Sequence, residues 1–65
     1  MYAKYAEVRD SKGMNDLAVA RKTGVPQSTI YDWRQRSEKN PDAGISVAHL
    51  VRIAQALDVG IEELV

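Results

Sequence analysis

Val-Ala-Arg-Lys-Thr-Gly-Val-Pro-Gln-Ser-Thr-Ile-Tyr-Asp-Trp, residues 19–33, is the stretch of sequence that decides the fold. Ala20 is small enough to let two helix axes approach closely, and Gly24, four residues later, permits a tight turn. Pro26 cannot stand inside a helix, but it suits the first position of one. The stretch therefore predicts two short helices joined by a tight turn, the smallest unit that presents a helix to the major groove.

The helix that follows this turn has one apolar face. Val25 is expected to enter the core just after the glycine, and Ile30 and Trp33 stand three residues apart on one side of the helix. At this position Trp33 is expected to be a core residue rather than a stacking surface. The side chains that remain on the outer side are those of Gln27, Ser28, Tyr31 and Asp32.

Helical patterns also precede and follow this unit. Apolar residues at helical spacing predict a first helix over residues 2–12, with a core face formed by Tyr2, Tyr5 and Val8. Gly13 should stop that helix, and Asn15 is placed to cap the second one, which ends near Gly24. The third helix is expected over residues 27–36, and residues 37–44 have the composition of a loop.

After this loop, Ser46 is expected to cap a fourth helix with a wide apolar stripe of Val47, Leu50, Val51, Ile53, Ala54 and Leu57. Gly60 should begin a short last helix that runs through Ile61 and Leu64. No segment shows a strand pattern of comparable strength. The prediction is an all-α, compact five-helix fold that forms a single domain over residues 1–65.

The composition excludes several kinds of chemistry. The 65 residues contain no cysteine and one histidine, His49, which we expect to be an exposed helix residue and not a ligand. Neither a metal site nor a cofactor is expected, and without a nucleophile–base pair the protein is predicted not to be an enzyme. The longest stretches without a charged residue, 23–31 and 43–51, have nine residues each, whereas a membrane span needs about 20. With no signal-peptide pattern at residues 1–7, a cytoplasmic protein is expected.

The formal net charge is zero, but the charges are unevenly distributed along the chain. Residues 1–40 hold eight basic and five acidic side chains, whereas residues 41–65 hold one basic and four acidic ones. This asymmetry indicates that one face of the protein meets an anion and the other meets water or a partner.

In this order and at these separations, the segments resemble the phage repressor/Cro (XRE-like) helix-turn-helix family over nearly the whole chain. Residues 9–14, Arg-Asp-Ser-Lys-Gly-Met, are similar to the end of the family's first helix and the following loop. Residues 19–25 resemble its second helix and turn, and residues 27–33 resemble its recognition helix. Residues 46–59 and 61–64 are similar to its last two helices. The resemblance implies a DNA-binding domain of the repressor type.

For the third helix, the resemblance implies contacts with base edges in the major groove. Gln27 is expected to contact adenine with both amide atoms, and Ser28 to donate to a base edge or a phosphate. Tyr31 is expected either to touch a thymine methyl group or a phosphate, or to be partly buried beside the loop. Asp32 either accepts from cytosine N4 or is a solvated or arginine-paired carboxylate, because an acid near phosphates is costly.

The phosphate contacts are expected from the loop that follows the recognition helix and from helix ends. The resemblance implies that four polar or basic side chains in this region contact the DNA backbone, namely Arg34, Arg36, Lys39 and Asn40. Thr29 is expected to be a phosphate contact or a packing residue.

The sequence departs from the family pattern at three places. Arg34 stands where many members have a glutamate that pairs with the arginine of the first helix, so Arg9 is expected to lack a partner and to meet phosphate. Asp16 stands where a Gln or Ser often donates to phosphate, so we expect Asn15 to take that role. Pro26 replaces a capping Ser or Thr and removes one amide donor.

These observations predict a sequence-specific regulator of transcription, most simply a repressor that occludes a promoter. We expect a weak homodimer that is stabilised on a pseudo-palindromic operator of double-stranded DNA, with residues 59–65 as the dimer surface that the resemblance implies. One alternative is an antitoxin-like protein whose main partner is another protein. Another is that the chain is the N-terminal part of a longer repressor.

Overall fold

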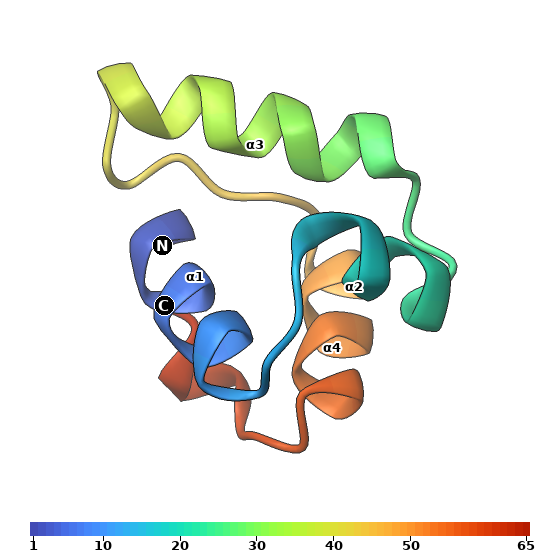
Figure 1. Cartoon of the computed structure of the whole chain (residues 1–65). Coiled ribbons are helices and arrows are strands. Elements are labelled where there is room, and N and C mark those ends of the chain that lie inside the picture. The colour runs from blue at the N-terminus through green and yellow to red at the C-terminus, as the bar shows by residue number, and fades with distance from the viewer.

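The computed structural model describes all 65 residues and contains helices but no strands (Figure 1). In chain order the elements are α1 (Tyr2–Ser11), α2 (Asp16–Thr23), α3 (Gln27–Lys39), α4 (Val47–Ala56) and one 3-10 turn, η1 (Ile61–Glu63). In Figure 1, α3 lies across one side of the molecule, over α1, α2 and α4. The all-α class is confirmed, although the fifth helix is only the three-residue turn η1. None of the helices combines the length and the apolar character that crossing a membrane requires.

The ends of the helices are set by the residues that the sequence indicates. Gly13 and Gly24 have φ angles of 69° and 77°, in the left-handed region that favours glycine. The side chain of Asn15 accepts a hydrogen bond from the amide of Ala18 at 2.8 Å, and that of Ser46 accepts one from the amide of His49 at 3.3 Å. These two caps satisfy amide groups that a first turn leaves unpaired, and they fix where α2 and α4 begin.

Trp33 lies at the centre of the core. Its side chain is fully buried, and the rings of Tyr2 and Tyr5 lie against it with centroids 5.3 and 5.0 Å away. The indole Nε1 donates to the carbonyl oxygen of Ala43 at 2.7 Å, so the polar atom of the ring is satisfied inside the core. Trp33 therefore joins α3 both to α1 and to the segment that leads into α4, and its predicted core position is confirmed.

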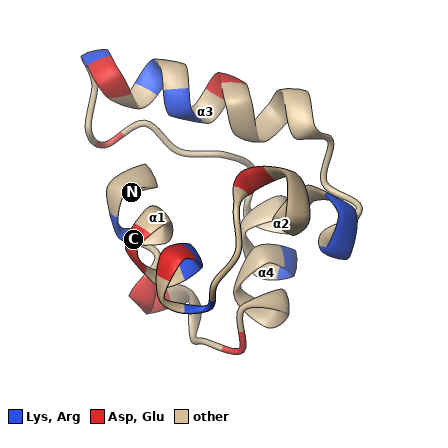
Figure 2. Ribbon diagram, viewed as in Figure 1, with Lys and Arg blue, Asp and Glu red and all other residues tan.

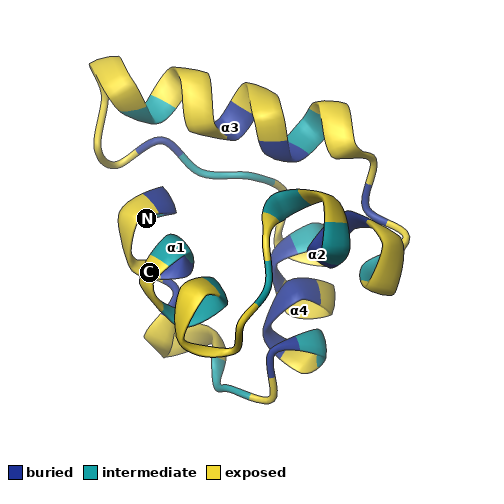
Figure 3. Cartoon of the chain, in the orientation of Figure 1, coloured by how far each residue is buried: buried dark blue, intermediate teal, exposed yellow.

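Buried residues line the inner sides of all four helices (Figure 3). Besides the three aromatic residues, the core contains Val19, Ala20, Val25, Ile30, Leu50, Ile53, Ala54, Leu57 and Leu64. The predicted apolar stripe of α4 is too wide, because Val47 is 69% exposed and Val51 is 39% exposed. The other four residues of the stripe already fill one face of α4, and the two valines lie on its flank.

The third helix, α3, is longer than predicted. It continues to Lys39, so three of the residues assigned to a loop are helical. The hydroxyl of Ser37 donates to the carbonyl oxygen of Arg34 at 2.6 Å and is thereby satisfied within the helix. The helix ends at Asn40, which has an extended backbone (φ −138°, ψ 99°) because it precedes Pro41.

Candidate nucleic-acid interface

The helix α3 is packed against the rest of the protein by one face only. Ile30 and Trp33 are fully buried, and Val25 enters the core from the turn itself. The opposite side of the helix is exposed, as Figure 3 shows. The four residues that the sequence assigned to the outer side all lie there, namely Gln27, Ser28, Tyr31 and Asp32. The structure therefore gathers the predicted base-contacting side chains on one accessible surface.

A shallow hollow lies at the first turns of α3, lined by Gln27, Ser28 and Tyr31. The side chain of Tyr31 is 60% exposed, so the residue is not mainly buried beside the loop, which was the predicted alternative to a DNA contact. The hydroxyls of Ser11 and Ser37 donate hydrogen bonds to carbonyl oxygens of their own helices. Ser28 makes no such bond, because it stands in the first turn and has no helical turn before it. The polar atoms around the hollow are therefore free to meet an outside partner.

Asp32 and Arg36 form an ion pair one turn apart on α3, with Nε and Oδ2 separated by 2.8 Å. Both side chains are largely exposed, so the pair adds only a few tenths of a kcal/mol to stability. The pair matters more for the charge of the surface than for the stability of the fold, because Arg36 compensates the negative charge of the Asp32 carboxylate. The arginine-paired form of Asp32, one of the alternatives that the sequence left open, is the one in the structure.

The cations predicted to meet phosphate lie on the C-terminal half of α3, and not in a loop as expected. Figure 2 shows the first turn of this helix without charged residues and the charged ones gathered from its middle onward. Arg34 and Lys39 are exposed and form no ion pair. Asn40 follows them at the end of the helix, where its Oδ1 accepts from the amide of Asp42 at 3.1 Å and its amide nitrogen is still able to donate.

The start of α2 offers a further donor. Asn15 is exposed and uses its Oδ1 to cap the helix, which leaves the two N–H groups of its side chain available. Thr29, on the inner side of the first turn of α3, is half-buried and belongs to the packing between helices as much as to the surface. As expected from Pro26, no side chain caps the start of α3.

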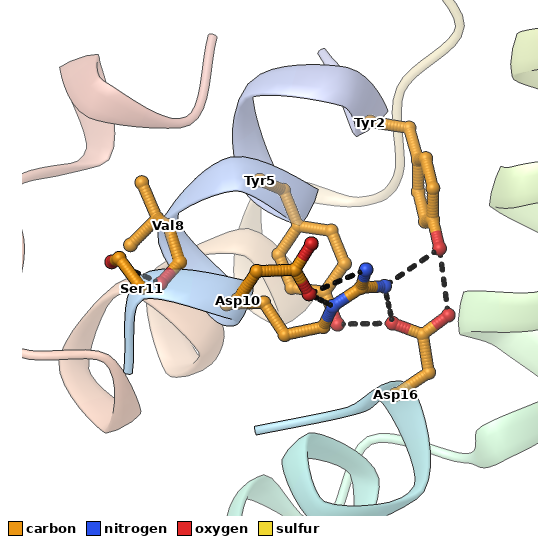
Figure 4. A network of polar contacts seen from close by, with 7 residues as sticks. Tyr2, Tyr5, Val8, Asp10, Ser11 and Asp16 are labelled. Carbon is orange, nitrogen blue, oxygen red and sulfur yellow. Dashed lines mark hydrogen bonds and ion pairs between the residues drawn. The ribbon is translucent and has the colours of Figure 1, made fainter. Parts of the chain in front are cut away.

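Arg9 has partners, and the expectation that it lacks one is wrong. Its Nη1 donates to Asp16 Oδ1 at 2.7 Å and to the Tyr2 hydroxyl at 3.0 Å, and its Nε donates to Asp10 at 2.9 Å (Figure 4). The hydroxyls of Tyr2 and Tyr5 both donate to the carboxylate of Asp16 at 2.7 Å. Asp16 thus provides in α2 the acidic partner that Arg34 does not provide in α3. Only 17% of the Arg9 side chain is exposed. Through its ion pair with Asp16, this side chain links α1 to the start of α2.

Burial and the network shift the pKa values of its members in opposite directions. Partial burial by itself would raise the pKa of Asp16, but the hydrogen bonds from Tyr5, Tyr2 and Arg9 outweigh burial and lower it. Burial raises the pKa of Tyr5, and the neighbouring carboxylate of Asp16 raises it further. The pKa of Tyr2 is raised by the same two causes. The network is therefore built for a charged Asp16 and two neutral tyrosines.

These shifts predict that stability falls at both ends of the pH range. The folded state lowers the pKa of Asp16, so its contribution is complete above the unfolded value of about 4 and is lost as the pH falls further. The folded state raises the pKa values of Tyr2 and Tyr5, so their contribution is complete below about pH 10 and is lost above it. Urea unfolding midpoints across this range measure both losses. The acid loss should be smaller in Asp16→Ala, and an unchanged acid loss in that variant would refute the assignment.

Gln35 is one residue of the outer face that the sequence reasoning missed. It is exposed, and it stands four residues after Tyr31 and seven after Ser28, which places it on the same side of α3. That spacing was readable in the sequence, but the helix was expected to end one residue later and the position received no role. The Arg9–Asp16 network was missed because its four members come from two helices whose relative position only the fold defines.

The helices α2 and α3, joined by a tight turn at Gly24 and packed with α1 and α4, form a helix-turn-helix. A family model described as helix-turn-helix matches residues 6–64. The chain belongs to this family, the phage repressor/Cro-like (XRE) helix-turn-helix family, whose members are DNA-binding regulators of transcription and not enzymes. Comparison with curated proteins and with solved structures gave no match.

Proposed function

We propose that the protein is a sequence-specific repressor that binds double-stranded DNA and occludes a promoter. The observation that supports this proposal is the outer face of α3, where polar side chains without intramolecular partners surround a shallow hollow on a helix fixed by Ile30 and Trp33. A rigid helix with free donors and acceptors is what reading of base edges requires. Residues 27–31, at the start of α3, are uncharged, so they would read bases by hydrogen bonds rather than by charge.

In this proposal the base-reading and phosphate-binding groups come from different parts of the surface. Gln27 and Ser28 read base edges at the start of α3, while Arg34, Lys39 and Asn40 bind phosphates from its C-terminal end. Asn15 binds a phosphate on the other side, at the start of α2. Arg36 joins the phosphate contacts when it leaves Asp32. Arg9 would have to break three side-chain hydrogen bonds to reach DNA, and we therefore assign it to the fold.

We further propose that two copies bind a pseudo-palindromic operator, with half-sites about 34–36 Å apart so that both recognition helices enter the same side of the duplex. The dimer surface would include Ile61 and Val65, which are 37% and 50% exposed. Leu64 was part of the expected dimer surface, but it is fully buried in the core and cannot contribute. With so little apolar surface left, the free dimer should be weak.

The proposal is tested by separating base reading from phosphate binding. Gln27→Ala should weaken binding to the preferred sequence by about 1–3 kcal/mol and relax the preference at one base pair, with no change in salt dependence. Lys39→Ala should weaken binding to all sequences alike and lower the slope of log affinity against log salt by about 1, because one counterion fewer is released. Titration of selected and scrambled duplexes at several salt concentrations measures both effects.

The matched control is Gln55→Ala, which removes an exposed glutamine from α4, away from the outer face of α3. It should bind like the parent protein. If Gln27→Ala weakens selected and scrambled duplexes equally, Gln27 is a phosphate contact and not a base reader. If Gln27→Ala and Lys39→Ala both leave DNA affinity unchanged, α3 is not the DNA surface, and an antitoxin-like protein partner becomes the better hypothesis.

A further inference from the structure

Tyr31 is the one aromatic residue of the protein that is not in the core. The other three aromatic side chains, Tyr2, Tyr5 and Trp33, pack against one another. Tyr31 is 60% exposed on α3, and its hydroxyl makes no hydrogen bond within the protein. The fold therefore gains little from this ring, and the ring places apolar surface in the middle of an otherwise polar helix face.

The position of the Tyr31 ring on α3 restricts which groups of the DNA it can contact. Tyr31 stands four residues after Gln27 and three after Ser28, so the three side chains are neighbours on one side of α3 and together line the hollow. This side lies opposite the buried Ile30 and Trp33, and it is the side that α3 would present to a groove that it enters. Because Gln27 and Ser28 are the proposed base readers, a ring that neighbours both of them would face bases as well.

The chemistry of the major groove leaves one apolar group for such a ring. Its floor presents hydrogen-bond donors and acceptors at every base pair, and the 5-methyl group of thymine is the apolar feature among them. The rise from Gln27 to Tyr31 is about 6 Å, which corresponds to about two base-pair steps. A thymine within two base pairs of the adenine read by Gln27 would bring its methyl group into the hollow.

We infer that Tyr31, with Gln27 and Ser28, forms a receptor for the methyl group of a thymine in each half-site. This inference rests on the proposed DNA-binding function and adds to it one base identity and the residue that reads it. The ring acts by covering the methyl group, so its hydroxyl is not needed. Burial of one methyl group is worth about fourfold in affinity.

The test uses duplexes selected from a random pool by the parent protein, with each thymine replaced in turn by deoxyuridine. This replacement removes the methyl group and leaves every hydrogen-bonding atom in place. At one thymine position of a half-site, the parent protein should lose affinity about fourfold, and about 16-fold when both half-sites are changed. Tyr31→Ala should bind the thymine and deoxyuridine duplexes equally, whereas Tyr31→Phe should keep the full difference.

Gln55→Ala is the matched control, because it removes an exposed side chain from α4, away from the outer face of α3, and should leave the deoxyuridine effect unchanged. Thermal melts of the Tyr31 variants should match the parent, since the ring is largely outside the core. If deoxyuridine has no effect at any position of a specifically bound duplex, the methyl receptor is refuted while the DNA-binding function stands. The same holds if Tyr31→Phe loses as much affinity as Tyr31→Ala, which would indicate a phosphate contact by the hydroxyl. If selection enriches no sequence, the proposed function itself fails.

Discussion

Trp33→Ala is expected to leave the protein largely unfolded at room temperature. Deletion of a large buried aromatic side chain costs about 3–5 kcal/mol, and small domains have at most about 5–15 kcal/mol of stability in total. The cost should lie at the upper end, because the indole contacts both Tyr2 and Tyr5 and satisfies the carbonyl of Ala43. Circular dichroism at 222 nm during urea titration measures the loss.

Tyr31→Ala is the appropriate control for this experiment, because it removes another aromatic ring from the same helix but from its exposed side. Its unfolding midpoint should stay close to that of the parent. A Trp33→Ala protein that melts within a few degrees of the parent would show that the indole is not in the core, and the register of α3 would then be wrong.

Asp16→Ala should be the most damaging change among the charged residues, at about 3 kcal/mol. It removes the acceptor of three hydrogen bonds at once and leaves the little-exposed guanidinium of Arg9 and two tyrosine hydroxyls without their partner. It also removes a negative charge from the first turn of α2, where the helix dipole favours one. Chemical denaturation of the variant and the parent at pH 7 gives the difference.

Asp10→Ala makes the same chemical change at the other acidic partner of Arg9. The side chain of Asp10 is 66% exposed, so this ion pair is screened by water and should contribute well under 1 kcal/mol. Equal losses in Asp10→Ala and Asp16→Ala would mean that the tyrosine hydroxyls add nothing, and the network would reduce to an ordinary surface ion pair.

Local signals predicted most of the fold. Gly13, Asn15, Gly24 and Ser46 act on the backbone next to them, so the boundaries of the helices that they cap follow from the sequence. The end of α3 was misplaced because Ser37 is compatible with both helix and loop, and the stop comes from Pro41. The exposure of side chains on a helix flank could not be predicted from the sequence either, because it depends on whether a neighbouring element covers them. No element covers Val47, which is 69% exposed.

The candidate site, too, was predictable where local signals decide and not where the packing of separate helices decides. The residues on the outer face of α3 were predictable, because Ile30 and Trp33 fix which side of the helix is buried. The pairing of charges was not, since Arg9 has acidic residues near it in sequence and in space, and only the relative position of α1 and the start of α2 in the fold selects Asp16. Asp32 and Arg36 pair within one helix, four residues apart, and that pair was readable in advance.

The zero net charge and its uneven distribution bear on how such a protein searches a genome for its site. A strongly cationic protein is held on any DNA by counterion release and slides along it, whereas here only the few cations proposed to meet phosphate, Arg34, Arg36 and Lys39, would release counterions. In the proposed complex these exposed cations on the C-terminal half of α3 would be attracted to phosphates only within a Debye length of about 8 Å. The search should therefore proceed mainly by short encounters from solution, and the time spent on wrong sequences should be brief.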